Sequence, residues 1–174
     1  MLNRRRERGL RTAEEEAGLA RGRARLMAIR DRRVRPAWDD KVLADWNGLM
    51  IAALAETGRL LGEPGWIEAA RQAFDFVLDR LVVDGRLRQA WRDGRARHAA
   101  TLDAYANMAR AAVALYEATG EAALLDQAQR WVGDADLHYW DGEGGGYFFT
   151  AADAEGLIVR SKTVHDNAVP PGNA

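Results

Sequence analysis

The sequence repeats itself at an interval of 58 residues, and this repeat restricts the chain to architectures built of stacked helical hairpins. Shifting residues 45–80 forward by 58 matches an Asp, a Gly-Glu pair and an Ala: Asp45 with Asp103, Gly62-Glu63 with Gly120-Glu121, and Ala70 with Ala128. Each copy is predicted to contain a long helix, a tight turn and a second helix, followed by a short extended stretch. A single hairpin cannot bury both of its faces, so such units stack side by side, here as part of a closed α/α toroid.

Apolar residues at three- and four-residue spacing predict the individual helices. A leading helix over residues 13–33 begins at the capping box Thr12-Ala-Glu-Glu15, and Pro36 ends it. The two hairpins are expected over 40–82 (helices 40–61 and 65–82) and 100–132 (helices 100–118 and 121–132). The fold class is therefore all-α, with short extended stretches at 87–91 and 146–150.

The last segment, residues 141–174, is rich in glycine and proline and is predicted to carry a short β-hairpin near the C-terminus. In it, Tyr147–Phe149 would pair with Leu157–Val159 around a turn at 153–156. The chain stops at Pro171-Gly-Asn-Ala174 without a folded terminus, so we expect it to be part of a longer protein. Two hairpins cannot close a ring, and the open flank is expected to favour self-association.

Composition excludes several classes of function. The chain has 174 residues, 48% of them hydrophobic, which suits one globular domain with a core. The longest apolar run, residues 49–55, is far shorter than the roughly 20 residues that span a bilayer, so no membrane partner is expected and a cytoplasmic location is the default. There is no cysteine, and the histidines at 98, 138 and 165 match no ligand spacing, so neither a metal nor another cofactor is expected.

Charge divides the chain into two parts, an Arg-rich leading helix (1–35) and a partial α/α-toroid domain (36–174). The net charge is −1, yet residues 1–35 hold twelve Arg against five acids. These arginines alternate with acids such as Glu14 and Glu16, and no aromatic residue lies among them to stack on bases. The pattern favours a solvated helix face over a nucleic-acid partner.

Only two of the 25 basic residues are lysines, Lys41 and Lys162. Where either cation serves, a drift toward arginine would replace lysine, but a compact ammonium and a planar guanidinium are not equivalent at a shaped site. The two lysines are therefore candidate ligand contacts, with chance retention as the alternative.

The strongest local motif is Trp38-Asp-Asp-Lys-Val-Leu-Ala-Asp-Trp-Asn-Gly48, at the start of a predicted helix. Acids at a helix N-terminus complement the helix dipole, which accounts for Asp39 or Asp40. It does not account for Lys41, Trp46 and Asn47 together. Aromatic faces that stack on sugar C–H groups, beside polar groups that bind hydroxyls, are typical of a carbohydrate pocket, and a small sugar-like substrate is the expected ligand.

The second copy of the repeat places Leu102-Asp-Ala-Tyr105 at the matching helix start. Asp45 or Asp40 would then face Asp103 across one pocket, and two carboxyl groups in different environments can divide acid and base roles. We predict Asp40 and Asp103 as the catalytic pair and Tyr105 as a second stacking platform. Helix N-terminal acids are the alternative. His165 is the best general base by sequence, with a surface histidine as its alternative.

A series of motifs in order resembles a known family: Arg35-Pro36, Asp39–Ile51, Leu102–Ala106, Gly144–Phe148, Arg160-Ser-Lys162 and Asp166–Asn173. They are similar to the helical domain of the YyaL-type, spermatogenesis-associated thioredoxin-domain proteins. The resemblance implies part of an (α/α)6 toroid like that of N-acylglucosamine epimerases and unsaturated-glucuronyl hydrolases. It also adds Arg160, Lys162 and Asp166 to the expected substrate-binding residues.

The resemblance leaves two functions open. One is glycoside hydrolase- or epimerase-like acid/base chemistry, and the other is a non-catalytic helical scaffold that partners a thioredoxin-like domain. The family commonly has Pro-Ser-Gly-Asn where this chain has Pro170-Pro-Gly-Asn173, so the serine hydroxyl is missing here. This segment has no cysteine, and no redox activity is expected of it.

Overall fold

The computed structural model describes residues 9, 12–154, 156–165 and 169–173, and the chain divides into two compact units, Met1–Asp39 and Asp40–Ala174. The first unit contains α1 (Ala13–Arg30), which carries the predicted capping box. The Thr12 hydroxyl accepts a hydrogen bond from the Glu15 N–H, and the Glu15 carboxylate accepts one from the Thr12 N–H. The helix ends at Arg30 rather than at residue 33, and none of its side chains is buried.

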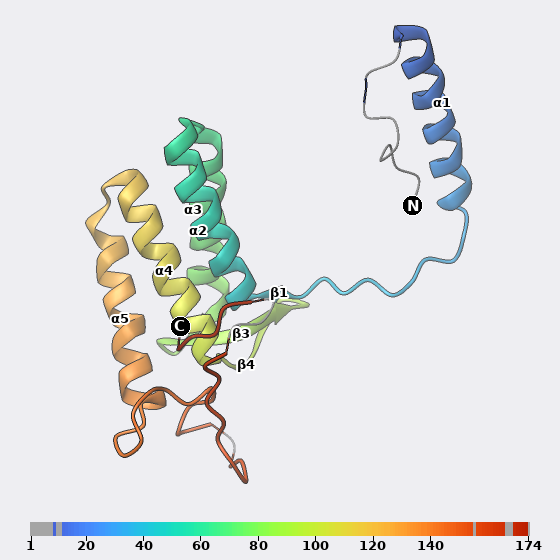
Figure 1. Cartoon of the computed structure of the whole chain (residues 1–174). Helices are drawn as coiled ribbons and strands as arrows, with labels where there is room; N and C mark the ends of the chain where they lie inside the picture. The colour runs from blue at the N-terminus through green and yellow to red at the C-terminus, as the bar shows by residue number, and fades with distance from the viewer. Residues whose placement is uncertain (1–8, 10–11, 155, 166–168, 174) are drawn as a thin grey trace. The chain divides into compact units, whose positions relative to one another are not determined.

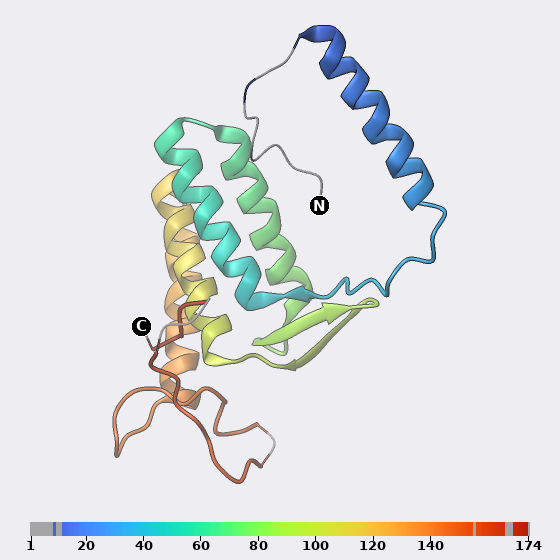
Figure 2. The same ribbon diagram turned by 45° about the vertical axis from the view of Figure 1, so that its right-hand side comes forward.

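The second unit consists mainly of four helices of 18 residues each: α2 (Ala44–Leu61), α3 (Pro64–Leu81), α4 (Leu102–Thr119) and α5 (Ala122–Tyr139). A shift of 58 residues along the sequence places α2 on α4 and α3 on α5, and the first and last residues of the paired helices then coincide. The helical repeat predicted from the sequence is thereby confirmed. Figures 1 and 2 show the four helices side by side, with α2 and α4 running in the same direction.

Each hairpin turns through a left-handed glycine followed by a Glu. Gly62 has φ of 68° and Gly120 has φ of 77°, and each donates its N–H to the last turn of the preceding helix. A residue with a side chain is strained in this conformation, so the two glycines fix where α2 and α4 end. Pro64, whose φ is already helical, opens α3.

The core of the second unit lies between the two hairpins. Helix α2 packs along α4, while α3 covers α2 and α5 covers α4. Gly48 on α2 is buried against the backbone of Asn107 on α4, so the two helices approach closely. Phe74 on α3 meets Trp131 on α5 edge to face, with ring centroids 5.6 Å apart. These contacts make the two hairpins one packed body.

A small antiparallel sheet follows the first hairpin. Its central strand β3 (Arg86–Arg92) pairs with β1 (Val42–Leu43), with β2 (Val82–Val83) and with β4 (Arg95–Ala99). Strands β3 and β4 form a hairpin around Asp93-Gly94, both with positive φ, as a two-residue type I′ turn requires. The extended stretch predicted at 87–91 is confirmed.

The β-hairpin predicted near the C-terminus is absent from the described tail. The backbone of residues 146–148 instead turns back onto the end of α5, where Phe148 donates its N–H to the Tyr139 carbonyl and Trp140 forms a single bridge with Tyr147. Phe149 then donates to the Ser161 carbonyl rather than to residues 157–159. The prediction was wrong because the glycines that precede Tyr147 allow the backbone to reverse its direction directly after α5.

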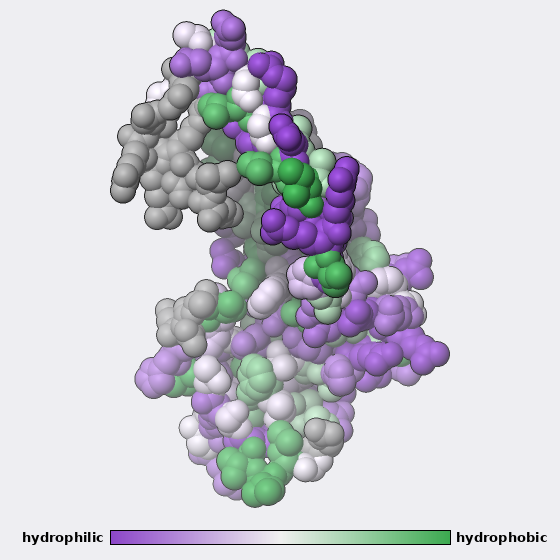
Figure 3. Space-filling model, turned by 90° about the vertical axis from the view of Figure 1, so that its right-hand side faces the viewer, coloured by the Kyte–Doolittle hydropathy of each residue, from purple (hydrophilic) through white to green (hydrophobic). Residues whose placement is uncertain are grey.

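No helix within the described ranges combines the length and the apolar character that crossing a bilayer requires. On the face drawn in Figure 3, hydrophilic residues predominate and the hydrophobic residues form small separate groups.

Candidate functional site

The two ends of the hairpin pair differ in kind. At one end the helices are joined by the tight Gly62-Glu63 and Gly120-Glu121 turns. At the other end lie the N-termini of α2 and α4 together with the long segment 82–101 and the described parts of the tail, 140–154, 156–165 and 169–173, as Figures 1 and 2 show. Loops carried on a rigid helical frame are where binding groups are commonly placed. This second end is therefore the candidate functional end, and it holds Asp103 and most of the polar residues predicted from the sequence.

Asp103 lies half-buried in the first turn of α4. Its Oδ1 accepts a hydrogen bond of 2.7 Å from the Gly172 N–H. Burial raises the pKa of the Asp103 carboxyl, the Gly172 hydrogen bond opposes the rise, and repulsion from Asp45 adds to it. Asp45 is thus the acid of the first repeat whose charge acts on Asp103, as expected from the 58-residue spacing.

The Gly-Asn pair near the C-terminus holds Asp103 in this position. A Cβ on Gly172 would stand 2.7 Å from the Leu102 Cγ, so a residue with a side chain could not approach α4 as closely. Asn173 fixes the segment by accepting from the Tyr147 N–H (2.8 Å) and donating to the Tyr147 and Thr163 carbonyls. The Pro171-Gly-Asn173 stretch is therefore a docking segment for the start of α4.

Asp40 belongs to a different cluster from Asp103. Its Oδ1 lies 2.7 Å from the Arg92 Nε at the end of β3, and both side chains are about half exposed. The β1–β3 pairing brings the two together, because Val42 stands opposite Trp91. Lys41 is exposed beside this pair. Of the two acids considered from the sequence, the structure brings Asp45 rather than Asp40 to Asp103.

The aromatic residues predicted to stack on a ligand have different environments. Trp46 is 61% exposed at the start of α2 and remains a candidate platform. Tyr105 is only 1% exposed, and its hydroxyl accepts from the Leu87 N–H at 3.2 Å. Tyr105 is a core residue, which corrects the prediction that its ring is a stacking platform. Asn47 donates its side-chain N–H to the Leu43 carbonyl and thereby closes the first turn of α2.

Arg160 ties the tail to the end of α5. Its guanidinium donates to the Thr150 and His138 carbonyls and lies 4.1 Å from the centre of the Phe148 ring. These contacts use much of its hydrogen-bonding capacity within the protein. The structure therefore gives Arg160 a clear role in shaping the tail.

Lys162 closes the glycine-rich loop. Its Nζ donates to the Asp141 carboxylate and to the Gly145 carbonyl, and it lowers the pKa of the Asp141 carboxyl to about 2. Asp166, the last of the predicted binding residues, lies outside the described residues. The retained lysine at 162 thus has a structural explanation that the sequence did not suggest.

One polar cluster was missed by sequence reasoning. Arg86 on β3 donates to Asp153 in the tail at 2.8 Å, and its Nη1 lies 2.9 Å from the His138 Nε2. Because a guanidinium only donates, His138 Nε2 accepts, and the proton of the neutral ring is on Nδ1, which is 3.4 Å from Asp153. The arginine hydrogen bond lowers the pKa of the Asp153 carboxyl. His165, the histidine favoured from the sequence, is exposed.

Among the described residues, no group of three or more His, Cys, Asp or Glu side chains is arranged to hold a metal ion. The groups that this end offers for chemistry are the half-buried carboxyl of Asp103, the carboxyl of Asp45 and the exposed indole of Trp46.

Replacing Asp45 with asparagine is expected to lower the pKa of Asp103 toward its usual value, because the repulsion between the two carboxylates is removed. Carboxyl ¹³C shifts followed through a pH titration would measure this. A raised folded-state pKa means that protonation of Asp103 favours folding. This stabilisation is complete below the unfolded-state pKa and is lost as pH rises through the folded-state pKa.

Over that pH window the denaturation midpoint of Asp103→Asn should therefore rise relative to that of the native chain. The control is Asp126→Asn, which changes an exposed acid on α5. The difference between its denaturation midpoint and that of the native chain should stay constant over the same pH window. An unchanged Asp103 titration in the Asp45→Asn variant would contradict the coupling.

Comparison with known proteins identifies the fold first. Cellobiose 2-epimerase from Spirochaeta thermophila superposes with a TM-score of 0.56 and 17% sequence identity over 65% of this chain and 30% of that one. At this identity the likeness concerns the fold alone, and it shows that the hairpin pair is part of an α/α toroid.

The family follows from the sequence comparison. No family model matches the chain. Human spermatogenesis-associated protein 20 is 35% identical over 164 residues, which cover 88% of this chain and 21% of that protein, and the mouse protein is 32% identical over 177 residues. The chain belongs to the spermatogenesis-associated protein 20 family, as its motifs predicted. It spans about a fifth of the length of these relatives.

Proposed function

We propose that this chain forms one wall of a carbohydrate-binding pocket at the end where α2 and α4 begin, and that the pocket performs acid/base chemistry on a sugar, either hydrolysis or epimerisation. The observation that carries the proposal is the environment of Asp103. Its carboxyl is half-buried, and its pKa is raised by burial and by repulsion from a second carboxyl, Asp45. Two carboxyl groups whose pKa values differ can act as acid and base in one reaction.

The surroundings of Asp103 agree with this role. Trp46 stands beside Asp45 in the first turn of α2 and offers an exposed indole to the C–H face of a sugar ring. The Gly172 N–H holds the Asp103 carboxyl in place at the start of α4. The α/α-toroid neighbour acts on the disaccharide cellobiose, and cellobiose is therefore a reasonable first probe.

The experiment is a titration of the whole chain with cellobiose, followed by ¹H–¹⁵N NMR. We expect shifts in the first turns of α2 and α4, and binding weakened about tenfold in Asp103→Asn, as the loss of one charge-assisted hydrogen bond implies. Asp45→Asn should behave similarly. Asp126→Asn, at the opposite end of the helices, is the control and should bind like the native chain.

The variant Asp40→Asn tests whether Asp40 or Asp45 is the carboxylate that acts together with Asp103. If Asp40 is the partner of Asp103, as the sequence predicted, its replacement should weaken binding as much as Asp45→Asn does. The structure favours little effect, because Asp40 is paired with Arg92. Unchanged affinity in both Asp45→Asn and Asp103→Asn would refute the proposed site.

A second candidate function is a non-catalytic scaffold for a thioredoxin-like domain. It is favoured by the fact that Asp40, Arg160 and Lys162 all bind groups of the protein itself. In that case cellobiose should cause no shifts, while a thioredoxin-like domain from a family member should be retained equally by the native chain and by Asp103→Asn.

A further inference from the structure

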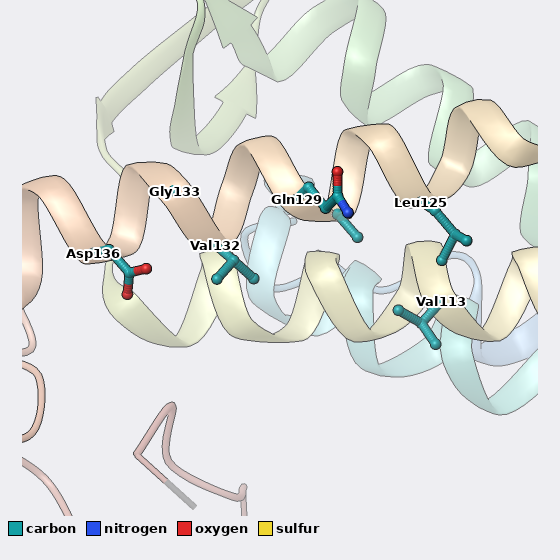
Figure 4. Close-up of a pocket in the computed structure, with 7 residues that line it drawn as sticks. Val113, Leu125, Gln129, Val132, Gly133 and Asp136 are labelled. Carbon is teal, nitrogen blue, oxygen red and sulfur yellow. The ribbon is translucent and has the colours of Figure 1, made fainter.

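The loop end carries a strongly basic element, the β3–β4 hairpin, which projects from this end of the helices in Figures 1 and 2. Its two strands hold five arginines: Arg86, Arg88, Arg92, Arg95 and Arg97. The pocket between α4 and α5 in Figure 4 is different in kind, because aliphatic side chains such as Val113 and Val132 line it on a flank of the helices. The helical hairpins of a toroid stack along such flanks. The β3–β4 hairpin lies at the loop end, which this stacking does not cover.

Strand register gathers four of these arginines on one face of the β3–β4 hairpin. Arg92 stands directly opposite Arg95, and residues opposite one another project from the same face of a sheet. Arg97 stands opposite Ala90 and therefore shares a face with it. Arg88 lies two residues before Ala90 on β3, so it projects from that face as well. This set is here called the arginine face: Arg88, Arg92, Arg95 and Arg97.

Little among the described residues neutralises the arginine face. Arg92 has Asp40 at 2.7 Å and Asp93 at 3.8 Å. The other three arginines form no hydrogen bond or ion pair with any residue that the structure describes, and Arg95 and Arg97 are exposed. Like charges directly opposite one another destabilise an antiparallel pair. An anion bound between Arg92 and Arg95 would remove this repulsion.

The chemistry of the arginine face suits a carboxylate or a phosphate. A guanidinium can donate two parallel N–H bonds to either group, which gives both strength and orientation. Binding to the bases of a nucleic acid would also require an exposed aromatic ring. The tryptophan of this hairpin, Trp91, projects from the other face, where its ring meets Phe76 of α3 with centroids 5.4 Å apart. The arginine face therefore favours a single anionic group over a nucleic-acid strand.

The arginine face lies near the proposed sugar pocket. Strand β1 pairs with β3, and α2 begins directly after β1. Asp40, which contacts Arg92, precedes Asp45 by five residues, a stretch of chain that spans at most roughly 18 Å. Trp46 follows Asp45 in the first turn of α2. Long arginine side chains and a short saccharide can together bridge this distance.

We propose that the sugar bound at this site carries an anionic group, either a carboxylate or a phosphate, and that the arginine face binds this group. The inference rests on the proposed sugar pocket and adds the class of its substrate. An anion held by the arginines leaves the uncharged ring to Trp46, Asp45 and Asp103. An anion turned toward the two carboxylates would be repelled, so the charge of the substrate fixes its orientation.

Three matched disaccharides test the proposal on the whole chain: cellobiose, its 6′-phosphate, and the same disaccharide with that C6 oxidised to a carboxylate. At fixed ionic strength, we expect an anionic form to bind about tenfold more tightly than cellobiose, as one charge-assisted hydrogen bond implies. It should also shift the ¹H–¹⁵N NMR signals of residues 88–97, which cellobiose should leave in place. The anionic form that binds more tightly identifies the group that the arginines bind.

The double variant Arg95→Gln/Arg97→Gln should lose this tenfold gain and bind cellobiose as the native chain does. Both arginines are exposed, and removing the charge opposite Arg92 should leave the hairpin folded, which its NMR signals would report. The matched control is Arg130→Gln, which changes an exposed arginine of α5 and should keep the gain.

Failure of this inference can be told apart from failure of the pocket. Asp103→Asn should weaken the binding of all three disaccharides equally and leave the tenfold gain intact. Equal affinities of the native chain for the three disaccharides would overturn the inference while the pocket stands, and so would a gain that the double variant retains. Inorganic phosphate and acetate that bind as tightly as the anionic disaccharides would overturn it too. Shifts at residues 88–97 that Asp45→Asn and Asp103→Asn do not affect would support the arginine face and refute the pocket.

Discussion

Trp131→Ala should lower the free energy of unfolding by about 3–5 kcal/mol, the usual cost of deleting a large buried aromatic side chain. Trp131 is 2% exposed and packs on Phe74, so it joins the second hairpin to the first. Its repeat equivalent is Ala73, so this large aromatic side chain is present in the second hairpin and not at the matching position of the first. Urea unfolding followed by far-ultraviolet circular dichroism would measure the loss.

The matched control is Trp38→Ala. Trp38 is 79% exposed and lies in the first unit, so its removal should change stability by no more than about 0.5 kcal/mol. A similar small effect for Trp131→Ala would mean that the two hairpins do not depend on this contact.

Gly48→Ala should destabilise the chain by about 1–3 kcal/mol, although alanine is the better helix former. An added Cβ would stand 2.7 Å from the Asn107 carbonyl carbon and 2.8 Å from its oxygen. Backbone atoms cannot rotate away as a flexible side chain can, so α2 and α4 would have to separate. The change would be measured as a shift of the thermal midpoint and of the urea midpoint.

Gly133→Ala provides the opposite result in the same fold. Gly133 lies within α5, and an added Cβ would meet no atom within 4 Å. The substitution should therefore stabilise the chain by up to about 1 kcal/mol through helix propensity. If both substitutions stabilised the chain, the close approach of α2 and α4 would be contradicted.

The helices could be predicted because their signals are local and occur twice. Apolar spacing and the Gly-Glu turns located α2, α3 and α4 to within a few residues. Helix α5 runs to Tyr139, beyond the end predicted near Val132, because Ala135 and Tyr139 continue its buried stripe past a tolerated glycine. The tail was mispredicted because its pairing depends on distant partners and not on its own alternation.

The candidate site was predictable where the repeat provided a second copy and not elsewhere. Asp103 was found by its equivalence to Asp45, and the structure couples the two electrostatically. Tyr105 shares a helix face with apolar residues, and that spacing indicates core more strongly than it indicates a pocket. His138 was missed because ending α5 too early placed it in a loop, far from Arg86 and Asp153.

The unequal ends of the hairpin pair have a consequence for how such a protein can change over generations. At the Gly62 and Gly120 turns, an insertion or a bulkier residue would disturb a left-handed cap and the register of two helices at once. At the opposite rim, lengthening a connection adds little loop-closure entropy and leaves the helices in place. New binding specificities can therefore arise at the loop end of the hairpin pair, while the end with the tight glycine turns tolerates little change.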